Sequence, residues 1–282
     1  MFKFNFSGGS APAEEERPQR QDPEPEVQVA TETVEITSYD ACQQAQALPS
    51  IELESGLELK RCTPLSDNSS LSEVTARTDV ESGVYEGGFK VWECTHDVLA
   101  LSKTDLNSLM SSCTSVLDLG CGHGLLGTAV ALKSNRHKVD CSVVFHDLNT
   151  QVLRTVVAPH VYANGLLDSS NNQVSYVAGD WRDPELARRV VAANGAKFDL
   201  VVTSETIYNE SYVASLIDTL CNVLAPQGHV ILAAKRLYFG VGGSVAHFLS
   251  LVERDGRLQV LQRHQFNDGM SVSRDVLVLT WK

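Results

Sequence analysis

The sequence predicts an α/β fold with a seven-stranded, mostly parallel sheet that carries helices on both faces. From Val116 onward, continuous apolar runs of strand length alternate with helix-like segments of about 10–15 residues, which is typical of buried parallel strands. The chain has 282 residues, 43% of them hydrophobic, and can therefore bury one full core. The sequence contains no internal repeat.

The first region along the chain is an acidic tail. Residues 11–40 contain nine Asp or Glu and two Arg, with prolines at positions 12, 18, 23 and 25 and few large apolar side chains. Such a composition buries too little apolar surface to fold. We therefore expect disorder from residue 7 to about residue 40, and we divide the chain into a tail, residues 1–45, and one domain, residues 46–282.

A β-hairpin is expected at the start of that domain. Residues 51–60 alternate apolar and polar side chains around Ser55 and Gly56, which suit a tight turn. This hairpin would form a lid or an addition to the edge of the main sheet. Residues 63–79 are polar and are predicted to be a linker.

Seven strands and five helices follow, mostly in alternation. The last two strands are expected to be short and close together. The predicted strands cover residues 115–120, 141–146, 173–178, 198–204, 228–235, 257–262 and 275–281. The predicted helices cover residues 124–134, 150–164, 184–194, 210–224 and 243–254.

The composition argues against several classes of function. A net charge of −12 disfavours general binding to nucleic-acid phosphates and would suit a basic protein partner, although it can also serve solubility alone. The sequence contains no run of 18 apolar residues, so no membrane span is expected. Residues 1–6 are too short and too polar for a signal peptide. The seven cysteines include no C-x-x-C pair, which fits reduced thiols. The eight histidines show no spacing typical of metal ligands, so no metal site is expected.

The most informative motif is the glycine-rich segment at residues 116–127. Its first four residues read as a buried strand, Gly120, Gly122 and Gly124 follow at alternate positions, and a helix begins near Leu125. Glycines let the backbone approach a ligand and a helix N-terminus offers free N–H groups, so the segment predicts a nucleotide cradle. Gly122, Gly124 and Gly127 also fit the dinucleotide-binding fingerprint G-x-G-x-x-G. A glycine turn that binds no ligand is a further alternative.

Asp118 favours one of these interpretations. It stands at the end of the strand, two residues before the first glycine. A carboxylate there suits the ammonium and sulfonium of S-adenosyl-L-methionine (AdoMet), which carries no phosphate, and would repel a pyrophosphate. In this register the segment resembles motif I of class I AdoMet-dependent methyltransferases, and Gly127 becomes mainly a helix-packing residue.

Three later strand ends also carry polar residues, and ligands of open α/β sheets bind beyond the carboxyl ends of the strands. Asp147 can hydrogen-bond both hydroxyls of a ribose, or it can be a turn residue or helix cap. Asp180 can accept from the adenine amine, and Trp181 can cover the adenine ring or fill the core instead. Ser204 and Glu205 would emerge at the methyl-transfer end of the cleft.

Together these segments resemble a specific family, the eukaryotic protein-histidine methyltransferases of the type of methyltransferase-like protein eighteen. The similarity runs in the same order along residues 80–282, and residues 2–6 are similar as well. Its most specific parts are Glu-Gly-Gly-x-Lys-x-Trp-Glu-Cys-Thr at residues 86–95 and Tyr-Phe-Gly-Val-Gly-Gly at residues 238–243. The resemblance implies a Rossmann-like class I methyltransferase fold with an antiparallel last strand and an N-terminal hairpin extension.

The resemblance also implies the reaction, the partner and the cofactor-binding residues. The reaction is methyl transfer from AdoMet to the tele nitrogen of a histidine, in a basic protein of the large ribosomal subunit. The implied AdoMet-binding residues are Val91, Trp92, Glu93, Cys94, Thr95, Asp118, Gly120, Gly122, Gly124, Asp147, Leu148, Asn149, Gly179, Asp180, Trp181 and Ser204.

Histidine chemistry places specific demands on the catalytic residues. Imidazole, with a pKa of ~6.5, is mostly neutral at pH 7, whereas a lysine with a pKa of ~10.4 must lose its proton at a cost of roughly 4–5 kcal/mol. A histidine methyltransferase therefore needs an acceptor for the N–H on the other ring nitrogen. Glu205 is the candidate acceptor and Tyr208 the candidate wall or hydrogen-bond partner, unless Glu205 pairs with Lys235 or Arg236 and only shapes the cleft.

Two other functions stay open, together with the role of one loop. A lysine methyltransferase of the related family sixteen usually carries Asp-x-x-Tyr after the fourth strand, where this chain has Ser-Glu-Thr-Ile-Tyr at residues 204–208. A non-catalytic AdoMet-binding factor of ribosome biogenesis is the other alternative. Residues 239–244 hold three glycines, which suit a loop close to substrate backbone or a plain connection.

Location and assembly are expectations of the same kind. We expect a cytoplasmic monomer without direct nucleic-acid or membrane partners. The human relatives carry a basic nuclear-targeting stretch, and this sequence has no such Lys/Arg cluster, so nuclear import is left open.

Overall fold

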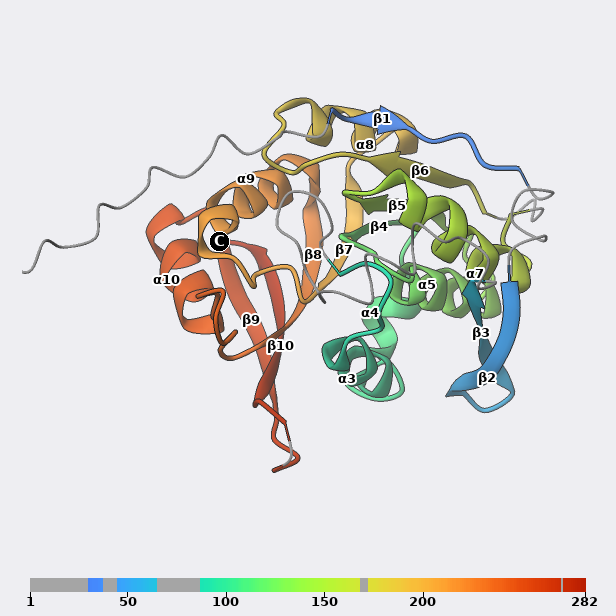
Figure 1. Ribbon diagram of the computed structural model, residues 1–282, viewed down its shortest axis with the longest axis horizontal. Helices are drawn as coiled ribbons and strands as arrows, with labels where there is room; N and C mark the ends of the chain where they lie inside the picture. The colour runs from blue at the N-terminus through green and yellow to red at the C-terminus, as the bar shows by residue number, and fades with distance from the viewer. Residues whose placement is uncertain (1–29, 38–44, 65–86, 168–171, 270) are drawn as a thin grey trace, which may run out of the picture.

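The computed structural model describes residues 30–37, 45–64, 87–167, 172–269 and 271–282 (Figure 1). Its centre is an eight-stranded sheet in the order β1-β6-β5-β4-β7-β8-β10-β9. The strands from β6 to β8 run parallel, whereas β10 is antiparallel to both of its neighbours. The strands are β1 (Glu32–Thr33), β4 (Ser115–Leu119), β5 (Ser142–Asp147), β6 (Val174–Ala178), β7 (Phe198–Ser204), β8 (Leu224–Lys235), β9 (Leu258–Phe266) and β10 (Arg274–Trp281).

The seven predicted strands are confirmed, and so is the antiparallel direction of the last one. Successive side chains of β4 point into different cores: Val116 packs in one apolar cluster and Leu117 in the other. The expectation that the last two strands are short is wrong, because β9 and β10 have 9 and 8 residues. Most of β9 is exposed at the sheet edge, so its polar residues concealed its length.

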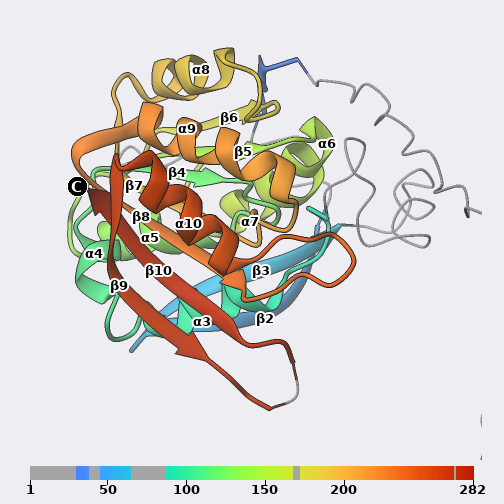
Figure 2. The same cartoon turned by 90° about the vertical axis from the view of Figure 1, so that its left-hand side faces the viewer.

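Helices cover both faces of this sheet (Figures 1 and 2). One apolar cluster joins the sheet to α3, α4, α5 and α7, and the other joins it to α8, α9 and α10. Within the described ranges, no helix has the length and apolar character that a membrane crossing requires. The helices are α3 (Glu93–Leu101), α4 (Asn107–Ser111), α5 (Leu125–Arg136), α6 (Thr150–Val152), α7 (Ala158–Ala163), α8 (Glu185–Asn194), α9 (Val213–Val223) and α10 (Val245–Asp255).

Local chemistry explains where the helices differ from the predictions. The segment predicted as one helix at 150–164 is divided by a π-helical turn, Leu153–Val157, just before Pro159, whose missing N–H interrupts the α-helical ladder. The helix predicted from residue 210 begins as a 3₁₀ turn, Glu210–Tyr212. α3 was not predicted because one of its buried positions is Asp97, which pairs with Arg274 at 2.6 Å and hides the apolar period.

The predicted hairpin is confirmed as β2 (Ala45–Glu54) and β3 (Leu57–Pro64). It forms its own two-stranded sheet, not an addition to the main one, and packs on α5 and α7. Leu53 and Leu59 are fully buried, and the buried Lys133 amine lies 3.5 Å from the Glu54 carboxylate. The predicted linker lies outside the described residues, except for positions 63 and 64, which end β3.

The expected disorder of the tail is wrong for residues 30–37. This segment contains β1, which pairs antiparallel with β6 at the edge of the sheet. Val34 is buried, and the Thr31 hydroxyl donates a 2.5 Å hydrogen bond to Asp183. The average composition of the tail concealed the apolar contacts of Val34 and Ile36. Residues 1–29 and 38–44 lie outside the described residues.

Candidate functional site

A cleft lies over the carboxyl ends of β4 to β7, where the strand order changes direction between β4 and β7. It spans about 880 Å³ of space, part of it open to solvent. The predicted site residues that line it are Val91, Trp92, Thr95, Asp118, Gly120, Gly122, Asp147, Leu148, Gly179, Asp180, Trp181, Ser204, Glu205 and Tyr208.

The remaining predicted cofactor residues do not line the cleft: Glu93, Cys94, Gly124 and Asn149. α3 begins at Glu93, so helical spacing turns Thr95 toward the cleft and leaves Cys94 fully buried in the core. Gly124 precedes α5 in a left-handed conformation, and a Cβ there would lie 2.7 Å from Val157 Cγ1. Asn149 precedes α6 as its N-cap residue.

The glycine loop takes a path that other residues would strain. Gly120 and Gly122 have φ angles of 66° and 51°. A Cβ at Gly120 would lie 2.7 Å from Thr206 Cγ2, so the side chains of the neighbouring strand end leave room only for backbone. The loop leads into α5, whose first residues, Leu125 and Leu126, line the cleft.

Asp118 is almost fully buried beneath the cleft, with 2% of its surface exposed. Its Oδ2 accepts a 2.8 Å hydrogen bond from the Gly127 N–H of α5. Burial raises the pKa of Asp118 to about 8, and the nearby Asp147 charge acts in the same direction. The carboxyl group alone is therefore mostly protonated at neutral pH, and a cationic ligand beside it would lower that pKa.

Asp147 and the preceding His146 hold the glycine loop in place. Asp147 Oδ2 accepts a 3.0 Å hydrogen bond from the Gly122 N–H. His146 Nδ1 accepts from the Gly120 N–H at 3.2 Å, and its Nε2 lies 3.0 Å from the Gly179 carbonyl, which assigns the proton to Nε2. Burial lowers the pKa of His146 to about 4. A neutral His146 thus joins the loop after β4 to the loop after β6.

Asp180 and Trp181 line the cleft where β6 ends. The guanidinium Nε of Arg182 lies 2.9 and 2.8 Å from the two carboxylate oxygens of Asp180, so this acid already has a counter-ion. The Arg182 guanidinium in turn stacks 4.3 Å from the centre of the Tyr212 ring. The Trp181 ring comes within 3.4 Å of the position that a Gly120 Cβ would take, and it also packs against the core. Trp181 therefore both covers the cleft and fills the core.

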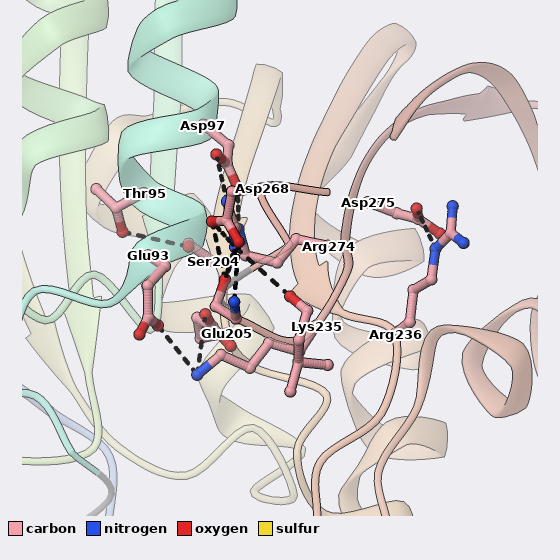
Figure 3. Close-up of polar contacts among 12 residues, drawn as sticks. Glu93, Thr95, Asp97, Ser204, Glu205, Lys235, Arg236, Asp268, Arg274 and Asp275 are labelled. Carbon is pink, nitrogen blue, oxygen red and sulfur yellow. Dashed lines mark hydrogen bonds and ion pairs between the residues drawn. The ribbon is translucent and has the colours of Figure 1, made fainter. Parts of the chain in front are cut away.

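The segment before α3 forms another wall of the cleft. Trp92 Nε1 donates to the Gly87 carbonyl at 3.1 Å, and the Lys235 amine lies 4.9 Å from the centre of the Trp92 ring. The Thr95 hydroxyl lies 3.2 Å from Ser204 Oγ and connects α3 to the end of β7 (Figure 3).

Glu205 combines a strained backbone with a buried carboxylate. Its φ is 60°, and its N–H donates to the Ala233 carbonyl at 2.8 Å. Oε2 accepts a 2.5 Å hydrogen bond from the Tyr238 hydroxyl, whereas the buried Oε1 has no hydrogen-bond partner of good geometry among the described residues. The Lys235 amine lies 4.0 Å from Oε1 and 3.0 Å from Glu93 (Figure 3).

The Cys94 thiol also lies beside this carboxylate. Burial, together with the charge of Glu205, raises the pKa of Cys94 far above its usual range. The thiol therefore stays protonated and is not a nucleophile at neutral pH.

A second hollow, which we call the side groove, opens beside Glu205 and encloses about 740 Å³. It shares Trp92, Glu205 and Tyr208 with the cleft. Tyr208 is 9% exposed, and its ring meets that of Tyr238 edge-on at 6.5 Å between centroids. The other residues that line the side groove are Lys235, Leu237, Tyr238, Phe239, Val241 and Val272.

Two residues that organise the site, Tyr238 and His146, have no role among the predictions from sequence. Tyr238 lies in the specific segment at residues 238–243, but its contact with Glu205 depends on how the loop folds back. His146 left a visible signal, since it is a polar residue inside an otherwise apolar strand and directly precedes Asp147.

Comparison with known proteins gives one family. A family described as lysine methyltransferase matches residues 72–254. A Dictyostelium discoideum protein named histidine protein methyltransferase 1 homolog is 35% identical over 209 residues, which cover 73% of this chain and 62% of that protein. The Bos taurus protein of the same name is 35% identical over 231 residues, covering 74% and 59%. Histidine protein methyltransferase 1 of Saccharomyces cerevisiae is 27% identical over 219 residues, covering 60% and 57%. The chain thus spans only about three fifths of these relatives' lengths.

Solved structures align at low sequence identity. Magnesium protoporphyrin IX methyltransferase from Synechocystis PCC 6803 with bound SAM gives a TM-score of 0.46 at 16% identity, over 76% of this chain and 93% of that chain. A TehB-like SAM-dependent methyltransferase from Corynebacterium glutamicum gives 0.46 at 18% identity, over 76% and 100%.

Proposed function

We propose that this chain, which belongs to the lysine methyltransferase family, transfers the methyl group of AdoMet to the tele nitrogen of a histidine in a protein substrate. The names of the Dictyostelium and bovine relatives support histidine as the acceptor. The observation that carries the proposal is the Glu205 carboxylate, which belongs to a residue that lines both the cleft and the side groove and whose Oε1 has no hydrogen-bond partner of good geometry among the described residues.

The residues of the cleft suit the chemistry of AdoMet. The buried Asp118 can pair with the cationic methionine end, and Asp147 can accept from ribose hydroxyls. Trp92 and Trp181 offer aromatic faces to the rest of the AdoMet molecule. The contact of Asp180 with the adenine amine stays a prediction. When bound, AdoMet supplies a methyl group on a sulfonium, which reacts by in-line displacement.

The task of the protein itself is to orient a neutral imidazole. Glu205 Oε1 accepts from one ring N–H, and the lone pair of the other nitrogen then faces the methyl group. Tyr238 fixes the carboxylate by donating to Oε2 at 2.5 Å, and Tyr208 forms the adjoining wall. The methylated ring is positively charged until its N–H proton leaves, and the same carboxylate stabilises that charge.

Lysine is the second candidate acceptor, because the family carries that description. A lysine arrives as an ammonium and must lose a proton, at a cost of roughly 4–5 kcal/mol at pH 7. Its ammonium would need the Glu205 carboxylate as a counter-ion. The Lys235 amine, which Glu93 holds at 3.0 Å, already lies 4.0 Å from Glu205 Oε1. A second ammonium would be repelled by Lys235, so the arrangement favours a neutral imidazole.

We extend the proposal to the substrate, a basic protein of the large ribosomal subunit. The net charge of −12 supports a basic partner, since opposite charges accelerate and orient association.

A transfer assay tests the proposal directly. Purified protein is incubated with tritiated AdoMet and isolated large ribosomal subunits, and the labelled proteins are hydrolysed in acid. We expect tele-methylhistidine as the labelled product. Methyllysine would establish the second candidate instead, and cofactor binding without any transfer would indicate a non-catalytic AdoMet-binding protein.

A further inference from the structure

The side groove shares part of its wall with the cleft. Trp92, Glu205 and Tyr208 line both the cleft and the side groove. On the proposed function the cofactor approaches Glu205 from the cleft, which leaves the side groove as the route for the acceptor. Whatever fills the side groove therefore belongs to the acceptor or lies directly beside it.

Three exposed apolar side chains border the side groove on the loop between β8 and α10. Leu237, Phe239 and Val241 are 44%, 77% and 49% exposed. Large apolar side chains that gather at the mouth of a groove are typical of a binding surface. Leu261 on β9 is 57% exposed and does not line the groove, so it offers a matched comparison.

The backbone of this loop is fixed without help from those side chains. The Tyr238 N–H donates to the Gly243 carbonyl at 2.9 Å, and the Gly243 N–H donates to the Tyr208 carbonyl at 2.8 Å. A Cβ at Gly243 would lie 2.1 Å from the Ile207 carbonyl oxygen, so only glycine permits this packing. The loop is thus shaped in advance, and its apolar side chains stay available for a partner.

We infer that the side groove binds a bulky apolar side chain of the protein substrate, from a residue within two positions of the acceptor histidine. The inference rests on the proposed function. Consecutive Cα atoms lie about 3.8 Å apart, so residues within two positions of the acceptor stay within about 8 Å of it, and the groove begins at Glu205 itself.

The charges around the side groove favour a basic protein segment as its occupant. Among the described residues that line it, Lys235 is the one cation, and the carboxylates of Glu205 and Glu93 both surround its amine. Glu210 lies against Gly242 of the same loop. Two copies of a chain with a net charge of −12 repel each other, whereas a basic segment is attracted.

Synthetic peptides test the inference on the full chain. Each peptide has a central histidine, two lysines at each end and alanine elsewhere, and one of the four neighbouring positions is replaced by leucine or phenylalanine. A second series carries lysine in place of the central histidine. Binding of fluorescein-labelled peptides to the protein saturated with S-adenosylhomocysteine is measured by anisotropy, and methyl transfer is measured as kcat/KM.

We expect one or more neighbouring positions at which an apolar residue raises peptide affinity about tenfold over alanine, as burial of such a side chain would. Phe239→Ala removes a mostly exposed side chain and should reduce that preference to less than twofold. The matched control Leu261→Ala should leave the preference unchanged. All three proteins should bind S-adenosylhomocysteine equally.

Several results would overturn the inference: no peptide binding, equal binding of all peptides, or a preference that survives in a Phe239→Ala, Val241→Ala double variant. A different result addresses the acceptor alone. If the lysine series is methylated with the same apolar preference and the histidine series is not, the proposed function is wrong while the role of the side groove stands.

Discussion

The cofactor cleft and the junction with the side groove both use left-handed backbone, but they place different residues in it. Gly120 and Gly122 have φ angles of 66° and 51°, and Glu205 has one of 60°. In the glycine loop a side chain would collide with its surroundings, as the 2.7 Å distance from a Gly120 Cβ to Thr206 shows. At Glu205 the strained backbone carries a full side chain, which agrees with the role that the proposed function gives to its carboxylate.

The two regions therefore achieve precision by different means. The glycine loop is held by hydrogen bonds from its own N–H groups to His146 and Asp147. Glu205 costs about 1–2 kcal/mol in backbone strain, and its hydrogen bonds with Ala233 and Tyr238 help to offset that cost. In the proposed function, backbone shape defines the cofactor end, and one buried side chain defines the acceptor end.

The largest expected effect separates these two ends. Glu205→Gln keeps the size of the side chain but removes the charge that orients the imidazole, so kcat for methyl transfer should fall at least about a hundredfold. Calorimetry should show unchanged AdoMet affinity. The control Glu253→Gln, at an exposed position of α10, should retain full activity. A Glu205→Gln protein with normal kcat would leave Glu205 a purely structural role.

Much of the fold could be predicted because its signals are local. Apolar strand-length runs and the helical spacing of apolar residues predicted the bounds of most elements from β4 to β10 to within a few residues. The exceptions are the start of β8 and the end of β9, where the strands are longer than predicted. α3 was missed because Asp97 reads as polar until its partner Arg274, 177 residues away, is known. β1 was missed because two residues of strand cannot be distinguished from an acidic tail by composition.

The site was predictable where it follows from topology. Asp118 and Asp147 end neighbouring parallel strands, so their convergence is a consequence of strand order. The pairing of Asp180 with Arg182 could not be predicted, because it depends on the side-chain conformation after β6. The Tyr238 contact could not be predicted either, because it depends on the fold of a loop.

The next largest effect is expected at the cofactor end alone. Asp118→Asn can still accept the Gly127 N–H but lacks the charge that pairs with the methionine ammonium. AdoMet affinity should fall about fiftyfold, as expected for a lost charge-assisted hydrogen bond, while kcat at saturating AdoMet changes little. Calorimetry measures the affinity, and exposed Asp140→Asn is the control. Undiminished affinity would show that the glycine register was misassigned.

A smaller effect is expected from pH. Burial raises the pKa of Asp118 to about 8, so below that value the carboxyl group must release its proton before it pairs with a cation. AdoMet affinity should therefore rise between pH 6 and 7.5, by up to about tenfold per unit. Calorimetry in buffers of different ionisation enthalpy should detect release of close to one proton at pH 6, and Asp118→Asn should show none. Wild-type binding without proton release would mean that Asp118 is already ionised.

The smallest effect tests the strained backbone itself. Glu205→Gly and Glu205→Ala both remove the carboxylate, but only alanine keeps a Cβ at a φ of 60°. The glycine variant should therefore be more stable by about 1 kcal/mol in urea denaturation, although glycine has the more flexible unfolded chain. At Glu253 in α10 the same pair of substitutions should give the opposite order, with alanine more stable by about 1 kcal/mol. If alanine is the more stable at both positions, the backbone at Glu205 is not left-handed in solution, and the contrast with the glycine loop disappears.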